Sequence, residues 1–242
     1  MKKTSKLIIT FIQIILITII IFSGMKIIEW IKSNKKNKEI MSQIKGSIVI
    51  DEKTDSDNKE YKIDFEKLKQ KNSDTIAWIK VNGTDIDFPV VKGTDNSYYL
   101  THNFNKEKNK AGWIFADYKN KLDGNDKNIV IYGHNMRDGS MFASLKNVIK
   151  EEWYNNENNK YVTLITENEC QIYQVFSVYQ TEAEEYYLQT DISDFGEFIE
   201  KIKNRSKKNF NVDIKEIDNI LTLSTCANDT KYRVVLHAVK IK

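Results

Sequence analysis

Two β-rich runs, ILTLSTC (residues 220–226) and YRVVLHAVKI (residues 232–241), flank the short polar segment 227–231. Six similar runs precede them: TIAWIKV, DIDFPVV, GWIFADY, NIVIYG, KYVTLIT and CQIYQVFSVYQ. Turn-forming pairs such as Asn82-Gly83, Asp123-Gly124 and Asp138-Gly139 separate several of these runs. Eight strands with few helices predict a mainly β fold, a closed or nearly closed β-barrel rather than a parallel α/β sheet.

Helical spacing of apolar residues interrupts the strands in three places. Phe65 and Leu68 open a short helical pattern, and MFASLKNVIKEEW (residues 141–153) forms a second. In the third, residues 192–202, apolar side chains recur at the spacing of one helix face. We therefore expect one helix before the strands and two between them.

The N-terminal region carries an apolar run from Leu7 to Ile31, of which Leu7–Met25 is 19 uncharged residues. A helix needs about 20 residues to cross a bilayer, whereas a secretory signal has a shorter apolar core. An uncleaved signal-anchor is favoured over a cleaved signal peptide, for which Ser23-Gly24 is a weak site, and over a buried helix. The expected organisation is a cytoplasmic tip and span over 1–31, a polar stalk over 32–61, and a folded domain over 62–242.

The formal net charge of +3 is unevenly distributed. Residues 1–50 hold nine Lys and two Glu, so the remainder is acidic overall. The positive charge therefore flanks the span and does not indicate a basic binding surface. More Lys follow the span than precede it, which taken alone favours a cytoplasmic C-terminal side.

Composition excludes several classes of protein. An apolar fraction of 40% is enough for a core, and two Cys are too few for a disulfide framework or a Cys-rich zinc module. We expect no metal and no cofactor. The basic run 201–208 has few aromatic residues, so it is interpreted as a solvated helix end and no nucleic-acid partner is expected.

The two cysteines occupy different settings. Cys226 ends a strand beside a polar loop, where a thiol is accessible, while Cys170 begins an apolar strand and is interpreted as structural. A Cys170–Cys226 disulfide is the alternative for an exported chain. A cysteine nucleophile needs a partner that moves protons.

His134 is the best candidate for that partner. It follows the apolar run 128–132 and a glycine, which places an imidazole at a strand end. Taken alone, a histidine in this setting is more often an ordinary surface or core residue than a catalytic one. The same interpretation applies to His102 and His237. His237 is expected to point out of the sheet, opposite Leu236 and Ala238.

Arginine use is selective, since only Arg137, Arg205 and Arg233 stand among 37 basic residues. A retained arginine suggests a need for its planar donor fork. If the segment after Cys226 folds back as a hairpin, Arg233 lies beside Cys226 and can donate to an oxyanion. Its alternative role is an ion pair, for example with Asp229. Arg137 is the second choice, and Arg205 is expected to be a solvated helix residue.

Three motifs in this order, IDFPVVKGTDNSYYL (86–100), YGHNMRDGSMF (132–142) and TLSTC (222–226) followed by Arg233, resemble the sortase family, most closely class B. The resemblance covers about residues 62–242. It implies an eight-stranded sortase barrel with an N-terminal helix and a helix inserted between late strands, for which residues 194–205 are well placed. It also implies a single-pass protein of a Gram-positive cell membrane with an extracellular catalytic domain.

The resemblance implies a cysteine transpeptidase. Cys226 would attack the Thr carbonyl of a C-terminal sorting signal to form a thioester, His134 would exchange protons with the amines, and Arg233 would hold the oxyanion. Ser224, Thr225, Asn96, Leu100 and Tyr132 match the positions that line the peptide groove. The partners would be sorting-signal-bearing surface proteins, a peptidoglycan amine, and membrane lipid through residues 7–31.

Two other functions stay open on the sequence. A thiol peptidase would cut the peptide without transferring it, and an inert membrane-tethered barrel would only bind wall peptide. The position of His134 before Cys226 argues against papain-like hydrolases, in which the cysteine comes first.

Overall fold

The computed structural model describes residues 2–46, 48–50, 61–226 and 231–242. Eighteen elements lie in these ranges: α1 (Lys2–Lys45), β1 (Ile48–Ile50), β2 (Tyr61–Ile63), α2 (Phe65–Lys71), β3 (Thr75–Val81), β4 (Asp87–Val91), η1 (Tyr98–Leu100), β5 (Phe115–Ala116), β6 (Asn128–His134), η2 (Ala143–Asn147), α3 (Glu151–Tyr154), η3 (Glu157–Asn159), β7 (Tyr161–Ile165), β8 (Cys170–Glu182), η4 (Tyr186–Leu188), α4 (Phe195–Asn204), β9 (Ile220–Cys226) and β10 (Tyr232–Lys240).

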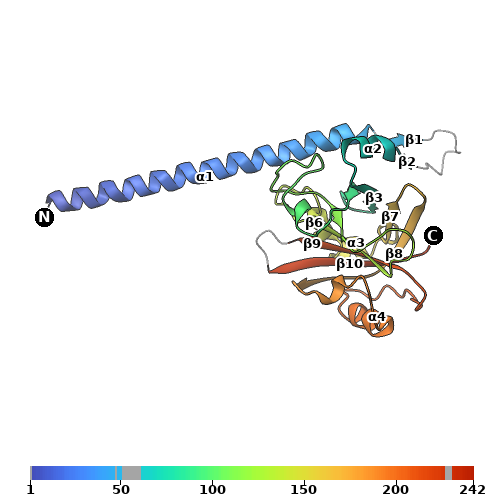
Figure 1. Cartoon of the computed structure of the whole chain (residues 1–242). Helices are drawn as coiled ribbons and strands as arrows, with labels where there is room; N and C mark the ends of the chain where they lie inside the picture. The colour runs from blue at the N-terminus through green and yellow to red at the C-terminus, as the bar shows by residue number, and fades with distance from the viewer. Residues whose placement is uncertain (1, 47, 51–60, 227–230) are drawn as a thin grey trace.

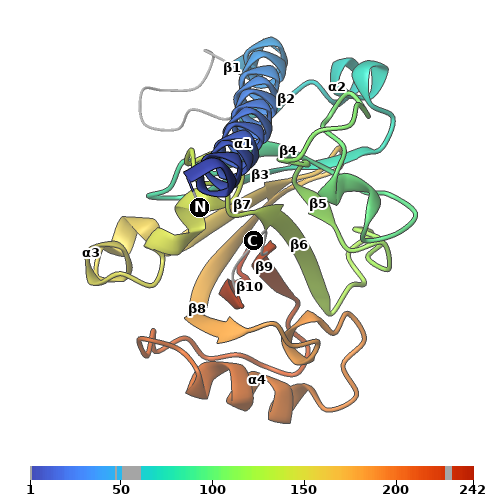
Figure 2. The same ribbon diagram turned by 90° about the vertical axis from the view of Figure 1, so that its left-hand side faces the viewer.

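Eight strands of the described chain close into a barrel in the order β10-β8-β7-β3-β4-β5-β6-β9. Most neighbours pair antiparallel, but β4 with β5 and β6 with β9 pair parallel. Figure 2 shows the barrel with α1 crossing one side and α4 lying along the other. The predicted mainly β barrel is confirmed. Each of its strands coincides with one of the eight runs read from the sequence, although β6 and β8 extend past the ends of theirs.

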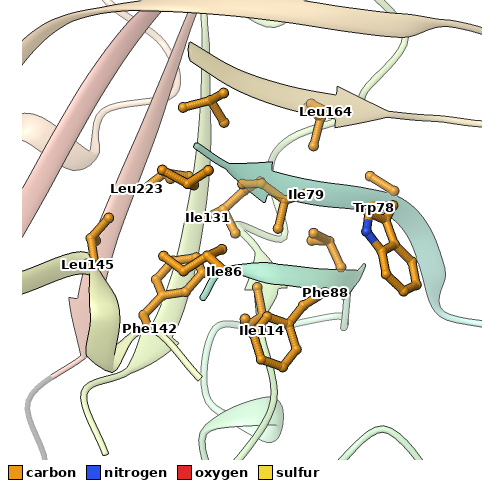
Figure 3. Close-up of a cluster of buried hydrophobic side chains, with 14 of the residues drawn as sticks. Trp78, Ile79, Ile86, Phe88, Ile114, Ile131, Phe142, Leu145, Leu164 and Leu223 are labelled. Carbon is orange, nitrogen blue, oxygen red and sulfur yellow. The ribbon is translucent and has the colours of Figure 1, made fainter. Parts of the chain in front are cut away.

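The barrel interior is filled by apolar side chains that alternate along the strands. Ile79, Ile131, Leu164 and Leu223 come from β3, β6, β7 and β9 and gather in this interior (Figure 3). Closure pairs each of the eight barrel strands on both sides, so none of these eight is an edge strand that could associate with another chain. The rim therefore rests on a rigid support, which suits residues that must hold a fixed geometry.

The helix α1 continues well past the expected span. The large apolar side chains from Leu7 to Ile28 are exposed, Trp30 is half-buried against the barrel core cluster, and Ile40 and Ile44 are buried in it. Figure 1 shows the first half of α1 projecting away from the barrel and its second half lying against it. The first part of the expected polar stalk is therefore helical and packed.

The helical segments are partly as expected. Asp64 caps α2 by accepting a hydrogen bond from the Lys67 backbone, and Asp194 caps α4 by accepting one from Glu197. The single helix expected over 141–153 is wrong, because this stretch forms η2 and the one-turn α3. Met141 itself has a positive φ of 54°, a backbone conformation that cannot start an α-helix.

A second apolar cluster covers the outer face of β8 and β10 beneath α4. Phe198, Ile199 and Ile202 of α4 pack there with Tyr179 and Val235. His237 does face away from Leu236 and Ala238, which belong to the barrel interior, but this layer buries it completely. The outer face of the sheet, on which His237 lies, is therefore buried in this second apolar cluster and is not a solvated surface.

Candidate active site

The candidate active site lies where the parallel strands β6 and β9 end together. Their register pairs His134 with Cys226, so the two backbones are neighbours at the barrel rim. The side chain of Cys226 lies outside the described part of the structure. Gly133 precedes His134, and a Cβ on it would come within 2.5 Å of the Phe142 ring. Glycine thus allows the Phe142 ring to pack directly against β6.

The imidazole of His134 is buried and held on one side. Its Nε2 lies 2.8 Å from the carbonyl oxygen of Leu100, which can only accept, so Nε2 carries a proton. Its Nδ1 is buried and has no hydrogen-bond partner among the described residues. Burial lowers the pKa of His134, the hydrogen bond to Leu100 opposes this, and the charge of Arg233 lowers it further. Neutral imidazole with a basic Nδ1 is therefore the dominant form at neutral pH.

Arg233 lies on the strand next to β9. The expected hairpin is present, because β9 and β10 pair antiparallel with Val235 opposite Ser224. Continuing this register by two residues brings Arg233 level with Cys226. Asp229, the alternative partner of Arg233, lies outside the described residues.

A groove of about 530 Å³ opens at this rim. It is lined by His134 and Arg233 and by the five residues expected to bind peptide, Asn96, Leu100, Tyr132, Ser224 and Thr225. The hydroxyl of Thr225 accepts a hydrogen bond from the Val234 backbone, and the hydroxyl of Ser224 lies 3.3 Å from that of Tyr187. These hydroxyls therefore join β9 to β10 and to the opposite wall.

Asp117 organises the groove wall and was missed by sequence reasoning. This buried carboxylate accepts hydrogen bonds from the Asn96 amide at 2.7 Å and from the Tyr132 hydroxyl at 2.9 Å. Its other oxygen accepts from the Lys119 backbone. The signal was an acidic residue directly after the apolar run that ends at Ala116.

The opposite wall comes from the segment after β8, with Ala183, Glu184, Glu185, Tyr187 and Leu188. Arg205, expected to be a solvated helix residue, instead pairs with Glu184 at 3.0 Å and lies over the Tyr186 ring. The expectation is wrong because α4 lies against this segment, so its last turn faces protein. Arg205 thereby ties α4 to the groove wall.

The remaining candidates lie elsewhere. Arg137 and His102 are absent from the groove lining, and His102 stacks on Tyr98. Cys170 is exposed, contrary to the expected structural role, because it starts β8 at the barrel rim opposite His134. Along β9, Cys226 is six residues, about 20 Å, beyond Ile220 at that opposite end, so a Cys170–Cys226 disulfide is excluded.

Comparison with known proteins agrees with this geometry. The Sortase domain model matches residues 79–241. Sortase B of Listeria monocytogenes is 36% identical over 225 residues, 91% of this chain and 90% of its own. The crystal structure of Clostridium perfringens sortase B is 43% identical with a TM-score of 0.69, covering 74% of this chain and all (100%) of its own. Sortase B of Bacillus anthracis, 32% identical, reaches a TM-score of 0.76 over 88% of this chain and 99% of its own.

A closed eight-stranded barrel with histidine and cysteine on a parallel strand pair, together with these relatives, defines a cysteine transpeptidase. The chain belongs to the sortase family, and the relatives named above are all sortases B. The resemblance read from the three sequence motifs is thereby confirmed.

Proposed function

We propose that this chain is a membrane-anchored sortase that cleaves a C-terminal sorting signal and transfers the protein to a peptidoglycan amine. Cys226 is the nucleophile, His134 the proton carrier and Arg233 the oxyanion donor. The observation that carries the proposal is the pairing of His134 with Cys226 at the groove, with Arg233 on the adjoining strand.

In the first half-reaction the Cys226 thiolate adds to the carbonyl carbon of the scissile Thr. The fork of Arg233 donates hydrogen bonds to the resulting oxyanion, which is a larger stabilisation in a shielded groove than in water. Collapse of the adduct breaks the C–N bond, and the amine leaves with a proton from Nδ1 of His134. A thioester between the substrate and Cys226 results.

In the second half-reaction an amine from the cell wall attacks the thioester. Nδ1 of His134 accepts the amine proton, and the Cys226 thiolate leaves. Since burial and Arg233 both lower the pKa of His134, the imidazolium needed for the first half-reaction is a minor form at neutral pH. We therefore expect slow turnover.

The anchor is the apolar half of α1. One helix in the described part of the chain, Lys6–Lys45, is long and apolar enough to span a membrane. Its exposed Leu, Ile and Phe side chains face lipid in this proposal, and the barrel lies on the outer side, where sorting signals and wall amines meet. Residues 1–31 then form the tip and span, 32–61 the linking segment and 62–242 the catalytic domain.

The test uses the full chain in lipid nanodiscs with a fluorogenic peptide copied from the C-terminal sorting signal of a surface protein of the same organism. Cleavage should require Cys226 and His134, and diaminopimelate or oligoglycine should yield a transfer product. Arg233→Lys should lose most activity although the charge is kept. Cys170→Ser, the control, should be unaffected.

Each alternative predicts a different outcome. Cleavage that survives Cys226→Ala would remove Cys226 as the nucleophile. Cleavage without an amine-dependent product identifies a thiol peptidase, and no cleavage of any sorting-signal peptide identifies a binding barrel.

A further inference from the structure

The loop between η1 and β5 connects α1 to the active-site histidine. On one side, Leu100 at the end of η1 accepts the Nε2 proton of His134. On the other side, Asn109 and Gly112 of the same loop hydrogen-bond to α1. The loop therefore contacts the second half of α1 with one end and His134 with the other.

The contact with α1 is a buried amide cluster. Asn109 donates from its side chain to the Ser33 carbonyl at 3.0 Å and to the Asn37 side-chain oxygen at 2.8 Å. Asn37 in turn donates to the Gly112 carbonyl at 3.2 Å. Asn37 is 2% exposed and Asn109 is 6% exposed. Hydrogen bonds of buried amides are costly to lose because the freed groups cannot be solvated.

Gly112 transmits this contact to the carbonyl that holds His134. Its φ of +55° favours glycine, and a Cβ there would lie only 2.8 Å from the Leu100 oxygen and 2.4 Å from the Tyr99 oxygen. Trp113 also donates its backbone N–H to the Tyr99 carbonyl. The backbone at 112 is thus packed against η1, so a displacement of Gly112 displaces the Leu100 carbonyl.

We propose that Asn37 of α1 is a positioning residue for His134, acting through Asn109, Gly112 and the Leu100 carbonyl. The second half of α1 is then a component of the active site as well as a link to the membrane. The Leu100 carbonyl keeps the proton of neutral His134 on Nε2 and leaves Nδ1 as the base. This inference rests on the proposed role of His134.

The test compares Asn37→Ala with Lys38→Ala in the full chain in nanodiscs. Lys38 is the exposed neighbour of Asn37, so it controls for placing an alanine in the same turn of α1. We expect Asn37→Ala to lower kcat about tenfold with KM within about twofold, because misplacing a catalytic group costs rate while the groove is intact. Lys38→Ala should match the wild type.

A second readout does not depend on substrate. The ¹⁵N chemical shifts of His134, assigned with His134→Gln, report which ring nitrogen carries the proton. We expect the Nε2–H tautomer in the wild type and in Lys38→Ala, and a mixture of both tautomers in Asn37→Ala. Gly112→Ala should move the same signals further.

The outcomes separate this inference from the proposed function. An Asn37→Ala chain with a lower Tm but wild-type kcat and tautomer would overturn the positioning role, whatever happens to Gly112→Ala. Cleavage independent of Cys226 and His134 would instead refute the proposed function, while the ¹⁵N signals would still test the link from α1 to His134.

Discussion

Asp117 fixes two side chains of the groove wall from behind. Asn96 and Tyr132 both donate to one of its oxygens, and the carboxylate is 4% exposed. Hydrogen bonds to a charged acceptor are each worth about 1.5–3 kcal/mol. Their loss should free both donors to rotate away from a bound peptide.

We therefore predict that Asp117→Ala raises the KM for a sorting peptide on the order of tenfold and changes kcat little. Steady-state cleavage by the full chain measures both. Asp213→Ala, at an exposed site, is the control. A fall in kcat at constant KM would contradict a role in peptide binding.

The hydrogen bonds of His237 can be assigned donor by donor. Asn128 donates its amide to Gln189, so its oxygen accepts from Thr222. Thr222 has then used its hydroxyl proton and must accept from Nδ1 of His237 at 2.9 Å. Nε2 of His237 is left to accept from the Tyr179 hydroxyl at 2.9 Å. This series of hydrogen bonds can form only when the imidazole of His237 is neutral.

This arrangement predicts an acid sensitivity. Burial lowers the pKa of His237 to about 3, with Arg205 adding to the effect, whereas an unfolded histidine titrates near about 6.5. Because the unfolded chain binds the proton first, His237 stabilises the fold above about pH 6.5 and loses that contribution as pH falls toward 3. Tm should therefore fall between about pH 6.5 and 4, and His237→Gln should show a smaller slope over that range.

At the residue scale, the sequence distinguished Cys226 from Cys170 by position in a strand, and strand position did locate His134 and Cys226 on one rim. It could not reveal that Cys170 is exposed or that His237 is buried. Both depend on which neighbour covers a strand, and α4, which covers His237, lies far from it in sequence. Local sequence patterns carry no information about whether a distant element buries a strand residue.

At the scale of elements, β6 is shaped by one glycine. A methyl group at Gly133 would overlap the Phe142 ring, whose side chain is fully buried. Phe142 also donates its backbone N–H to the His134 carbonyl at 2.9 Å, so the ring cannot simply withdraw. Strand β6 must shift instead, and with it His134.

Gly133→Ala should destabilise the fold by about 1–3 kcal/mol, the usual cost of overpacking, and lower kcat. Urea unfolding and peptide cleavage measure the two effects. Adding Phe142→Leu should recover part of both losses because the smaller side chain leaves room. Strictly additive losses in the double variant would contradict the overlap.

Strands were predictable and helices less so, for a physical reason. The runs that became β3, β6 and β10 alternate or are continuously apolar, and short turns delimit them. The stretch 141–153 has helical spacing, but Met141 adopts a positive φ and η2 is tied to β6. Tertiary contacts there override a pattern too short to stabilise a helix by itself.

At the scale of the whole molecule, α1 stabilises the barrel directly. Ile44 is fully buried in the core cluster, while Ile28 of the same helix is 55% exposed. Ile44→Ala in the full chain should lower the free energy of unfolding by about 2–5 kcal/mol. Ile28→Ala should leave it unchanged, and tryptophan fluorescence during urea titration follows both. Equal effects would contradict docking of the second half of α1.

This docking was not foreseen because residues 32–45 are rich in Lys and Asn. The signal was present, since Trp30, Asn34, Asn37, Met41 and Ile44 recur at helical spacing. Two of these five are amides, which a hydropathy pattern counts as exposed. Their burial depends on the matching amide of Asn109, which only the folded loop brings near.

Because α1 is one continuous helix, it fixes the distance between the lipid and the groove. In the proposed membrane pose, Asn37 lies twelve residues after Met25, the end of the uninterrupted uncharged run, and twelve helical residues rise about 18 Å. The groove, attached at that level, is then held at a constant height above the lipid. An extended peptide covers about 3.3 Å per residue, so a substrate tethered in the same bilayer reaches the groove with five or six residues of polar spacer. Substrates with shorter spacers are excluded by reach alone, before any side chain is recognised.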